Sequence, residues 1–236
     1  MNEPLHKVQL SVLKDLRHTT AARYSTLMRP TGLQSEDFKF HLRKLNKLGY
    51  VEKTDDGAYH LTARGKEFAN NLDDSKRLVQ QQPKLSILLL VPRAGRLGQE
   101  VEYLFQQRRR NPYFGYWSVI GGPAQWGEDF EVTAAKELYK QTGLTAACRV
   151  LSFIRQRDFY DATDSLLEDK LFVVMEASDV TGQLSNSWYG GLNKWMTLKD
   201  YLRQLKQFES VTKAVEMLKS GKVYSSHNSR YKPQDY

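Results

Sequence analysis

One stretch of this chain, Gly121 to Leu144, limits the possible fold more than any other part of the sequence. It reads GGPAQWGEDFEVTAAKELYKQTGL, with glycines at both ends and charged residues at fixed intervals between them. Residues three and four apart share one face of a helix, so Glu137, Lys140 and Gln141 are expected to project together. Upstream, Lys84 to Val91 (KLSILLLV) is typical of a buried strand. The pattern therefore predicts a helix that packs on a sheet.

The spacing in this stretch resembles the Nudix box, G-x5-E-x7-R-E-U-x-E-E-x-G-U, in which U is an aliphatic residue. The positions that fit, with lysine in place of the arginine, are Gly122, Glu128, Lys136, Glu137, Leu138, Gly143 and Leu144. The family has adjacent glutamates, the core of its magnesium site, where this chain has Lys140 and Gln141. The resemblance implies an α+β fold: a Nudix-like α/β/α sandwich with a mixed sheet over residues 84–205. It also implies a ligand of the nucleoside diphosphate type.

The two replacements weaken any magnesium site. Mg²⁺ is usually held by one or two carboxylates plus substrate phosphates. Gln141 offers only a neutral oxygen, and the ammonium of Lys140 repels a divalent ion by on the order of 5 kcal/mol at roughly 6 Å and an effective dielectric of about 20. We therefore expect no catalytic residue and no cofactor, with weak Mg²⁺ binding left to Glu128, Glu137 and Glu168. Lys140 is expected to pair with the diphosphate of a ligand instead.

A cationic and aromatic segment precedes the box. Arginines bind phosphate through paired donors, and aromatic rings stack on bases. The candidate ligand-binding residues are Arg108, Arg109, Arg110, Tyr116, Trp117 and Lys140. An equally supported alternative is that the aromatic residues belong to the core of a hairpin. In that hairpin Glu102 to Gln107 would pair with the strand at Lys84 to Val91.

Residues 1–75 have a different pattern, that of three helices and a hairpin. Leu10, Leu13 and Leu16 recur at helical spacing, and a third helix is predicted from Ser35 to about Leu48. The segment that follows alternates like a strand and turns back at a glycine.

The string HLRKLNKLGYVEKTDDGAYHLTARGKEF, from His41 to Phe68, resembles the recognition helix, wing and following helix of small bacterial winged helix-turn-helix regulators. The resemblance implies that the third helix enters the DNA major groove and that the hairpin is the wing. The DNA-binding candidates are Ser35, Glu36, Lys39, Arg43, Lys44, Lys47 and Lys53. The alternative is a protein-interaction module whose basic helix face is only solvated.

Length and charge agree with two small domains that have anionic partners. The chain has 236 residues, a net charge of +8 and a pI near 9.4. We expect a linker at 76–83, and at 206–236 a C-terminal helix, Ser210 to Ser220, followed by a flexible tail. Cys148 is the only cysteine, so no internal disulfide forms. No signal peptide or membrane span is visible, and a cytoplasmic location without a membrane partner is expected.

Together these features predict a DNA-binding transcriptional regulator. Its degenerate Nudix domain would sense a nucleotide-like phosphorylated small molecule and change the spacing of two winged helices in a homodimer. The alternative is an active Nudix hydrolase, a pyrophosphatase that uses non-standard metal ligands. A third interpretation, a scaffold without either activity, requires a pocket closed by Trp126 or by the aromatic segment.

Overall fold

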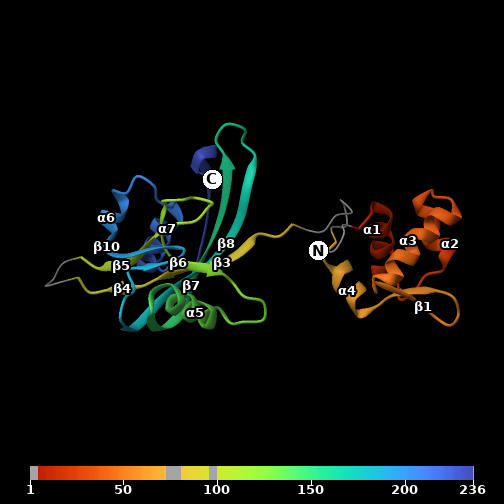
Figure 1. Cartoon of the computed structure of the whole chain (residues 1–236), viewed down its shortest axis with the longest axis horizontal. Coiled ribbons are helices and arrows are strands. Elements are labelled where there is room, and N and C mark those ends of the chain that lie inside the picture. The colour runs from red at the N-terminus through yellow and green to blue at the C-terminus, as the bar shows by residue number, and fades with distance from the viewer. Residues whose placement is uncertain (1–4, 73–80, 96–99, 236) are drawn as a thin grey trace. The chain divides into compact units, whose positions relative to one another are not determined.

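The computed structural model describes residues 5–72, 81–95 and 100–235 (Figure 1). The chain divides into two compact units, Met1–Gln81 and Gln82–Tyr236, and each is described by itself. The first part of the predicted linker, residues 76–80, lies outside the described residues.

The first unit is built from helices around one short hairpin. Its elements are α1 (Lys7–Arg17), α2 (Tyr24–Met28), the 3-10 turn η1 (Arg29–Thr31), α3 (Ser35–Lys47), β1 (Val51–Lys53), β2 (Tyr59–Leu61) and α4 (Ala63–Asn70). The apolar stripe of α3, formed by Phe38, Leu42 and Leu45, is buried in a core with Leu13 and Leu16 of α1. The helix and hairpin elements predicted for this segment are therefore present.

Local contacts fix the hairpin against the helices. β1 and β2 pair antiparallel, and Gly57 sits in the turn between them with a φ of +84°. The backbone of Ala22, just before α2, exchanges two hydrogen bonds of 2.9 and 2.8 Å with Tyr59. Thr62 caps α4 and also donates to the carbonyl of Gly49 at 2.6 Å. The hairpin therefore has a defined position beside α2 and α3.

The second unit is organised around one mixed sheet. Its strands are β3 (Lys84–Leu90), β4 (Pro92–Arg93), β5 (Glu102–Arg108), β6 (Trp117–Pro123), β7 (Leu144–Tyr160), β8 (Leu166–Gly182), β9 (Ser187–Trp188), β10 (Gly191–Thr197) and β11 (Tyr224–Tyr231). The strand order is β11-β7-β8-β3-β6-β5-β10-β9, and β4 pairs with β5. β3 and β8 run parallel, as do β11 and β7, whereas the other pairs are antiparallel.

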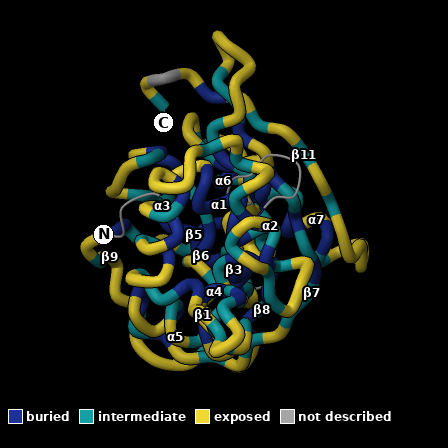
Figure 2. Tube along the Cα trace, turned by 90° about the vertical axis from the view of Figure 1, so that its right-hand side faces the viewer, coloured by how far each residue is buried: buried dark blue, intermediate teal, exposed yellow. Residues whose placement is uncertain are grey.

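Helices cover both faces of this sheet. Ile87, Leu89 and Val91 point to one face and share a core with residues of α5 (Phe130–Thr142). Leu88 and Leu90 point to the other face and share a core with residues of α7 (Glu209–Ser220). Since side chains of a strand alternate between faces, a continuous apolar run is required where both faces are covered. The last four residues of β3 are buried, and Figure 2 colours buried residues dark blue. The predicted α/β/α sandwich with a mixed sheet is confirmed.

Two predictions about this unit are wrong. The strand β3 does not pair with β5, because β6 lies between them and β5 pairs instead with β4, β6 and β10. The tail after α7 is not loose either. Tyr224–Tyr231 forms β11, which runs parallel to β7 along eight residue pairs, and Tyr231 at its end is buried against Tyr113 and Tyr116.

The helix predicted at Ser210 to Ser220 is confirmed as α7, and it ends at Gly221 in the left-handed conformation. A shorter helix, α6 (Leu198–Leu202), precedes it. Within the described ranges, none of the helices combines the length and the apolar content needed to cross a bilayer.

The ordered C-terminal strand generates a stability prediction. Replacing buried Tyr231 by alanine is expected to lower the free energy of unfolding of the second unit by about 3 kcal/mol, because the ring leaves a cavity among other aromatic rings. Tyr224→Ala, on the same strand but 53% exposed, is the matched control and should stay within about 0.5 kcal/mol of the wild type. Urea denaturation followed by tryptophan fluorescence reports this unit alone, since all four tryptophans lie in it. Equal effects of both changes would show that β11 does not pack as described.

Candidate functional site

The predicted box forms one continuous strand-loop-helix-strand unit. β6 ends at Pro123, a loop leads into α5, and Gly143, with a φ of +74°, ends the helix before β7. Gly122 lies directly against the side chain of Glu137. A Cβ atom at Gly122 would come within 2.9 Å of the Glu137 Cδ, so the Glu137 side chain would have to shift. At Gly121 a Cβ atom would come within 2.4 Å of the carbonyl oxygen of Ile87, so a glycine is needed there.

The two replaced positions of the box hold its central carboxylate. Lys140 Nζ donates to Glu137 Oε1 at 2.9 Å, and Gln141 Nε2 donates to Glu137 Oε2 at 2.6 Å. Gln141 is 1% exposed, and the same amide nitrogen donates to the carbonyl of Gly121 at 2.8 Å. Both oxygens of Glu137 therefore already accept hydrogen bonds from the side chains that stand in the places of the family's paired glutamates.

The other box carboxylate, Glu128, is held in the same way. Its Oε2 accepts from Thr133 Oγ1 at 2.6 Å, and its Oε1 accepts from Lys136 Nζ. The hydrogen bonds from Lys136 and Thr133 hold the pKa of Glu128 below its ordinary value. The carboxylate is therefore ionised, and it is compensated by a lysine of α5, the helix that follows it.

Glu168, on β8, is also paired with lysines. It is 8% exposed and accepts from Lys84 Nζ at 2.5 Å and from Lys170 Nζ at 2.8 Å. Burial acts to raise the pKa of Glu168, but the hydrogen bonds from Lys170 and Lys84 outweigh it and lower the pKa.

These pairings decide how well the residues fit Mg²⁺. Each of the three candidate carboxylates, Glu128, Glu137 and Glu168, has a lysine ammonium as a hydrogen-bonded partner. A divalent ion would have to displace that ammonium or lie beside it. Within the part of the chain that the structure describes, no group of three or more histidine, cysteine or acidic side chains is placed to hold a metal. The donor set does not fit the magnesium site of the box.

Next to the box lies a cleft of about 320 Å³. Gly121 and Gly122 line it on one side. Four basic side chains also line it, namely Lys84, Arg108, Arg110 and Lys170. Glu168 is the one acidic residue among the described residues of the lining. Since four cations face one carboxylate, the cleft favours an anionic ligand.

A buried hydrogen-bond network supports the cleft wall. Asp158 is fully buried and accepts from Tyr113 Oη at 2.6 Å, Gln156 Nε2 at 2.6 Å and Lys170 Nζ at 2.5 Å. Burial and the neighbouring carboxylate raise the pKa of Tyr113, so its hydroxyl remains a neutral donor. Lys170 thus bridges Asp158 and Glu168 and is held in one position at the cleft.

The structure brings only some of the predicted ligand-binding residues to this cleft. Arg108, whose guanidinium donates to the carbonyl of Pro112 at 2.9 and 3.2 Å, and Arg110 line it. Arg109 is exposed and lines a neighbouring hollow instead. The remaining candidates lie elsewhere, with Tyr116 buried in the core, Trp117 packed against that core and Lys140 paired with Glu137 and 5.8 Å from the ring of Trp188.

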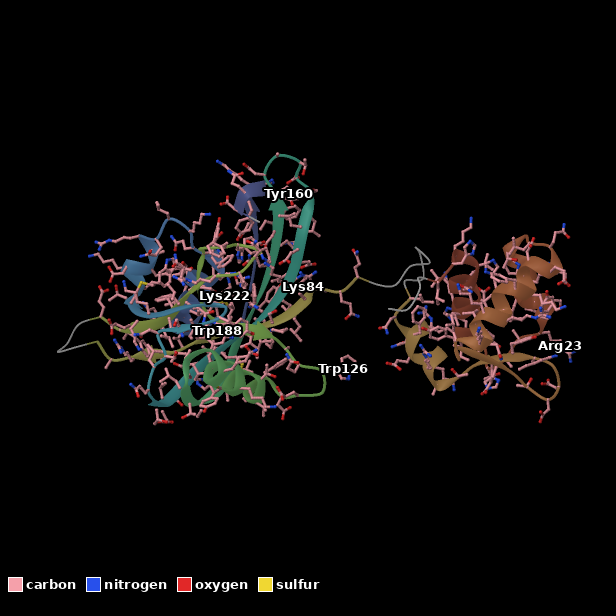
Figure 3. The ribbon with its side chains drawn as sticks, viewed as in Figure 1. Arg23, Lys84, Trp126, Tyr160, Trp188 and Lys222 are labelled. Carbon is pink, nitrogen blue, oxygen red and sulfur yellow. The ribbon has the colours of Figure 1, made fainter. Side chains whose placement is uncertain are left out.

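Trp126 does not close the cleft. It lies in the loop between β6 and α5, is fully exposed, and projects away from the body of its unit in Figure 3. The buried aromatic residues Tyr113 and Tyr116 form part of the core and leave the hollow open. The condition for the scaffold interpretation, a closed pocket, is therefore not met by these residues.

Two cations of the cleft, Lys84 and Lys170, were not among the ligand-binding residues predicted from the sequence. They are direct neighbours across the parallel pair of β3 and β8. The alternation of Glu168 and Lys170 along one strand places their side chains on the same face and could have indicated a charged wall. The pairing of Lys170 with Lys84 depends on strand register, which the local sequence does not contain.

The predicted DNA-binding residues are brought together on the first unit. Six of them belong to α3, and Lys53 ends β1. Arg43 and Lys47 are exposed, Lys44 is half-buried, and Lys39 pairs with Glu36 at 3.4 Å. The hydroxyl of Ser35 at the start of the helix lies 3.2 Å from that of Tyr24. The helix therefore presents a basic face away from its core.

Comparisons with known proteins agree with the architecture of the second unit. A family model for the NUDIX domain matches residues 84–216, which is more than half of the chain. A search of curated proteins found no match.

Among solved structures, the chain is similar to the NUDIX domain of Shewanella oneidensis NrtR complexed with ADP ribose. The identity is 18% and the TM-score 0.51, over 65% of this chain and 96% of that one. It is also similar to a MutT protein from Bacillus halodurans, at 18% identity and a TM-score of 0.49 over 65% of this chain and 93% of that chain. The similarity to the NrtR domain shows the fold of the second unit.

The pairing of Glu137 generates a prediction about magnesium. Replacing both Lys140 and Gln141 by glutamate removes the two donors and adds two carboxylates on the same helix face, so Mg²⁺ affinity should rise at least tenfold. Calorimetric titration of the chain with MgCl₂ measures this gain. A charge-matched control, Lys199→Glu with Gln204→Glu near α6, should show no change. A double variant on α5 that binds Mg²⁺ no better than this control would contradict the account.

Proposed function

The chain belongs to the NUDIX domain family, and we propose that its second unit binds a nucleoside diphosphate-type ligand without hydrolysing it. We propose further that its first unit binds DNA. The whole chain would then be a transcriptional regulator that responds to this ligand. The two parts rest on different observations.

The ligand proposal rests on the charges of the cleft and the box. Four cationic side chains line the cleft, and the box carboxylates that would hold a metal are paired with lysines and an amide. In metal-assisted hydrolysis of a diphosphate, the metal activates the attacking water and stabilises the transition state. A cleft that has these cations but no fitted metal site can still bind the diphosphate, but it lacks the metal's contribution to hydrolysis.

The class of ligand is supported by one structural relative. The NUDIX domain of Shewanella oneidensis NrtR was solved in complex with ADP ribose, a nucleoside diphosphate derivative. The paired donors of Arg110 and Arg108 and the ammonium of Lys84 suit a diphosphate. We use ADP ribose as the probe of this class.

The DNA proposal rests on α3. Its inner stripe is fixed in the core of the first unit, and its outer side carries Arg43, Lys44 and Lys47. A helix that is held on one side and basic on the other can enter the major groove while its cations contact phosphates. The hairpin with Lys53 would lie along the backbone as the wing.

We propose that the regulator is a homodimer in which the ligand changes the spacing of two such helices. Binding of ligand and DNA would then be coupled. Because coupling free energy is reciprocal, DNA must shift the ligand affinity by the same factor by which the ligand shifts the DNA affinity.

The cleft generates the first functional prediction. ADP ribose should bind the wild-type chain, and Lys84→Ala or Arg110→Ala should each weaken binding about tenfold, because each removes one charge-assisted hydrogen bond. Isothermal titration calorimetry measures the affinities. Lys194→Ala, an exposed lysine on β10 outside the cleft, is the matched control and should bind like the wild type.

Product analysis separates this proposal from the hydrolase alternative. After incubation with ADP ribose and Mg²⁺, the nucleotide should be recovered intact. Magnesium-dependent release of AMP at a rate set by enzyme concentration would establish a hydrolase and overturn the proposal.

The basic face of α3 generates the second functional prediction. A random-sequence DNA duplex should bind the wild-type chain with an affinity that falls as salt rises, because phosphate contacts release counterions. Changing Arg43 and Lys47 to alanine should reduce the slope of log K against log salt by about two, one per lost phosphate contact. Fluorescence anisotropy measures both slopes.

The control for this experiment changes two exposed lysines outside α3, Lys7→Ala on α1 and Lys66→Ala on α4. This control variant loses two positive charges, as the α3 variant does. If the control lowers the slope as much as the α3 variant does, net charge rather than the α3 face controls binding.

A further inference from the structure

The outer face of α3 contains an apolar residue that the charge pattern does not reveal. Phe40, Arg43, Lys44 and Lys47 are spaced at i, i+3, i+4 and i+7, so they form one stripe along the helix. Phe40 is 63% exposed. Among the described residues of the first unit, it is the one large apolar side chain that is exposed.

Phe40 does little for the stability of its own unit. The core of α3 is made by Phe38, Leu42 and Leu45, which lie on the opposite side of the helix and are at most 3% exposed. The ring of Phe40 contacts that of His41 edge to face, with the centroids 5.5 Å apart. An exposed phenylalanine on a helix gains nothing from solvent and has only moderate helix propensity. Its side chain is therefore available to a partner.

The neighbours of Phe40 define the chemistry of that partner. Three cationic residues follow Phe40 on its stripe, whereas Glu36 and Asp37 lie one turn before it and Glu36 pairs with Lys39. The C-terminal part of the stripe therefore favours a partner that is anionic around an apolar group. The DNA major groove has this combination, because phosphates line its edges and each thymine displays a 5-methyl group within it. Apolar side chains such as phenylalanine contact that methyl group in sequence-specific complexes.

We propose that Phe40 is a specificity-determining residue that contacts the 5-methyl group of a thymine. The cations of the stripe contact phosphates and set the register of α3, whereas Phe40 reads one base pair. This inference rests on the DNA binding proposed above and adds to it the residue and the base group that carry sequence preference.

The test removes the methyl group without changing base pairing. A preferred duplex is first selected from a random pool with the full-length wild-type chain, and each thymine in it is then replaced by deoxyuridine. Burial of one methyl group corresponds to about a fourfold change in affinity, so replacement at one position should weaken wild-type binding by about that factor. Phe40→Ala should bind the thymine and deoxyuridine duplexes equally at that position.

Two further variants complete the experiment. Phe40→Leu keeps an apolar side chain and should retain a preference for thymine. Phe114→Ala removes another exposed phenylalanine, 58% exposed on the second unit, and should discriminate like the wild type. Because Phe40 is exposed, all variants are expected to fold, which circular dichroism checks.

The outcomes separate the two proposals. If the wild-type chain binds DNA but shows no preference for thymine at any position, or if Phe40→Ala discriminates as well as the wild type, the inference about Phe40 is overturned while DNA binding stands. If the wild-type chain binds no duplex even at low salt, the DNA-binding proposal fails and this inference fails with it.

Discussion

The pairing of Glu137 with Lys140 and Gln141 is the interaction on which the interpretation of this protein depends. In the NUDIX family pattern the positions of Lys140 and Gln141 carry acids, and a cluster of acids needs a cation to be stable. Here the chain supplies the compensation itself, with an ammonium on one carboxylate oxygen and a buried amide on the other. Gln141 also ties α5 to the backbone of Gly121, so the replacement is part of the packing between helix and sheet. The same principle recurs at Glu128 with Lys136, and at Glu168 with Lys84 and Lys170.

Glu168 and Asp158 offset two of the four cations that line the cleft, which leaves a net positive charge for a ligand. Lys170 is fixed by Asp158, which lies at the centre of a network with Tyr113 and Gln156. Burying charged groups is costly unless each is paired and hydrogen-bonded, and here the described partners meet that need. The result is a rigid cationic wall, since the lysine does not have to be reoriented when an anion arrives. A pre-organised site of this kind favours binding.

Local patterns in the sequence predicted local structure well. The third helix, expected from Ser35 to about Leu48, is α3 at Ser35–Lys47, because its apolar stripe and its basic stripe are separated by helical periodicity. Contacts distant in sequence were not predicted. β6 inserts between β3 and β5, and Lys84 meets Lys170 across a parallel pair, neither of which any local pattern encodes. The polar segment Tyr224–Tyr231 lacks apolar alternation, so its order comes from backbone pairing with β7 and from one buried tyrosine at its end.

The most direct test of the central claim, a nucleotide receptor that works without a metal, is a calorimetric titration of the full-length chain with ADP ribose in EDTA and then in Mg²⁺. The account predicts saturable binding of similar affinity in both conditions, with the ligand recovered intact. Binding that requires Mg²⁺ and is followed by magnesium-dependent cleavage of ADP ribose would contradict it.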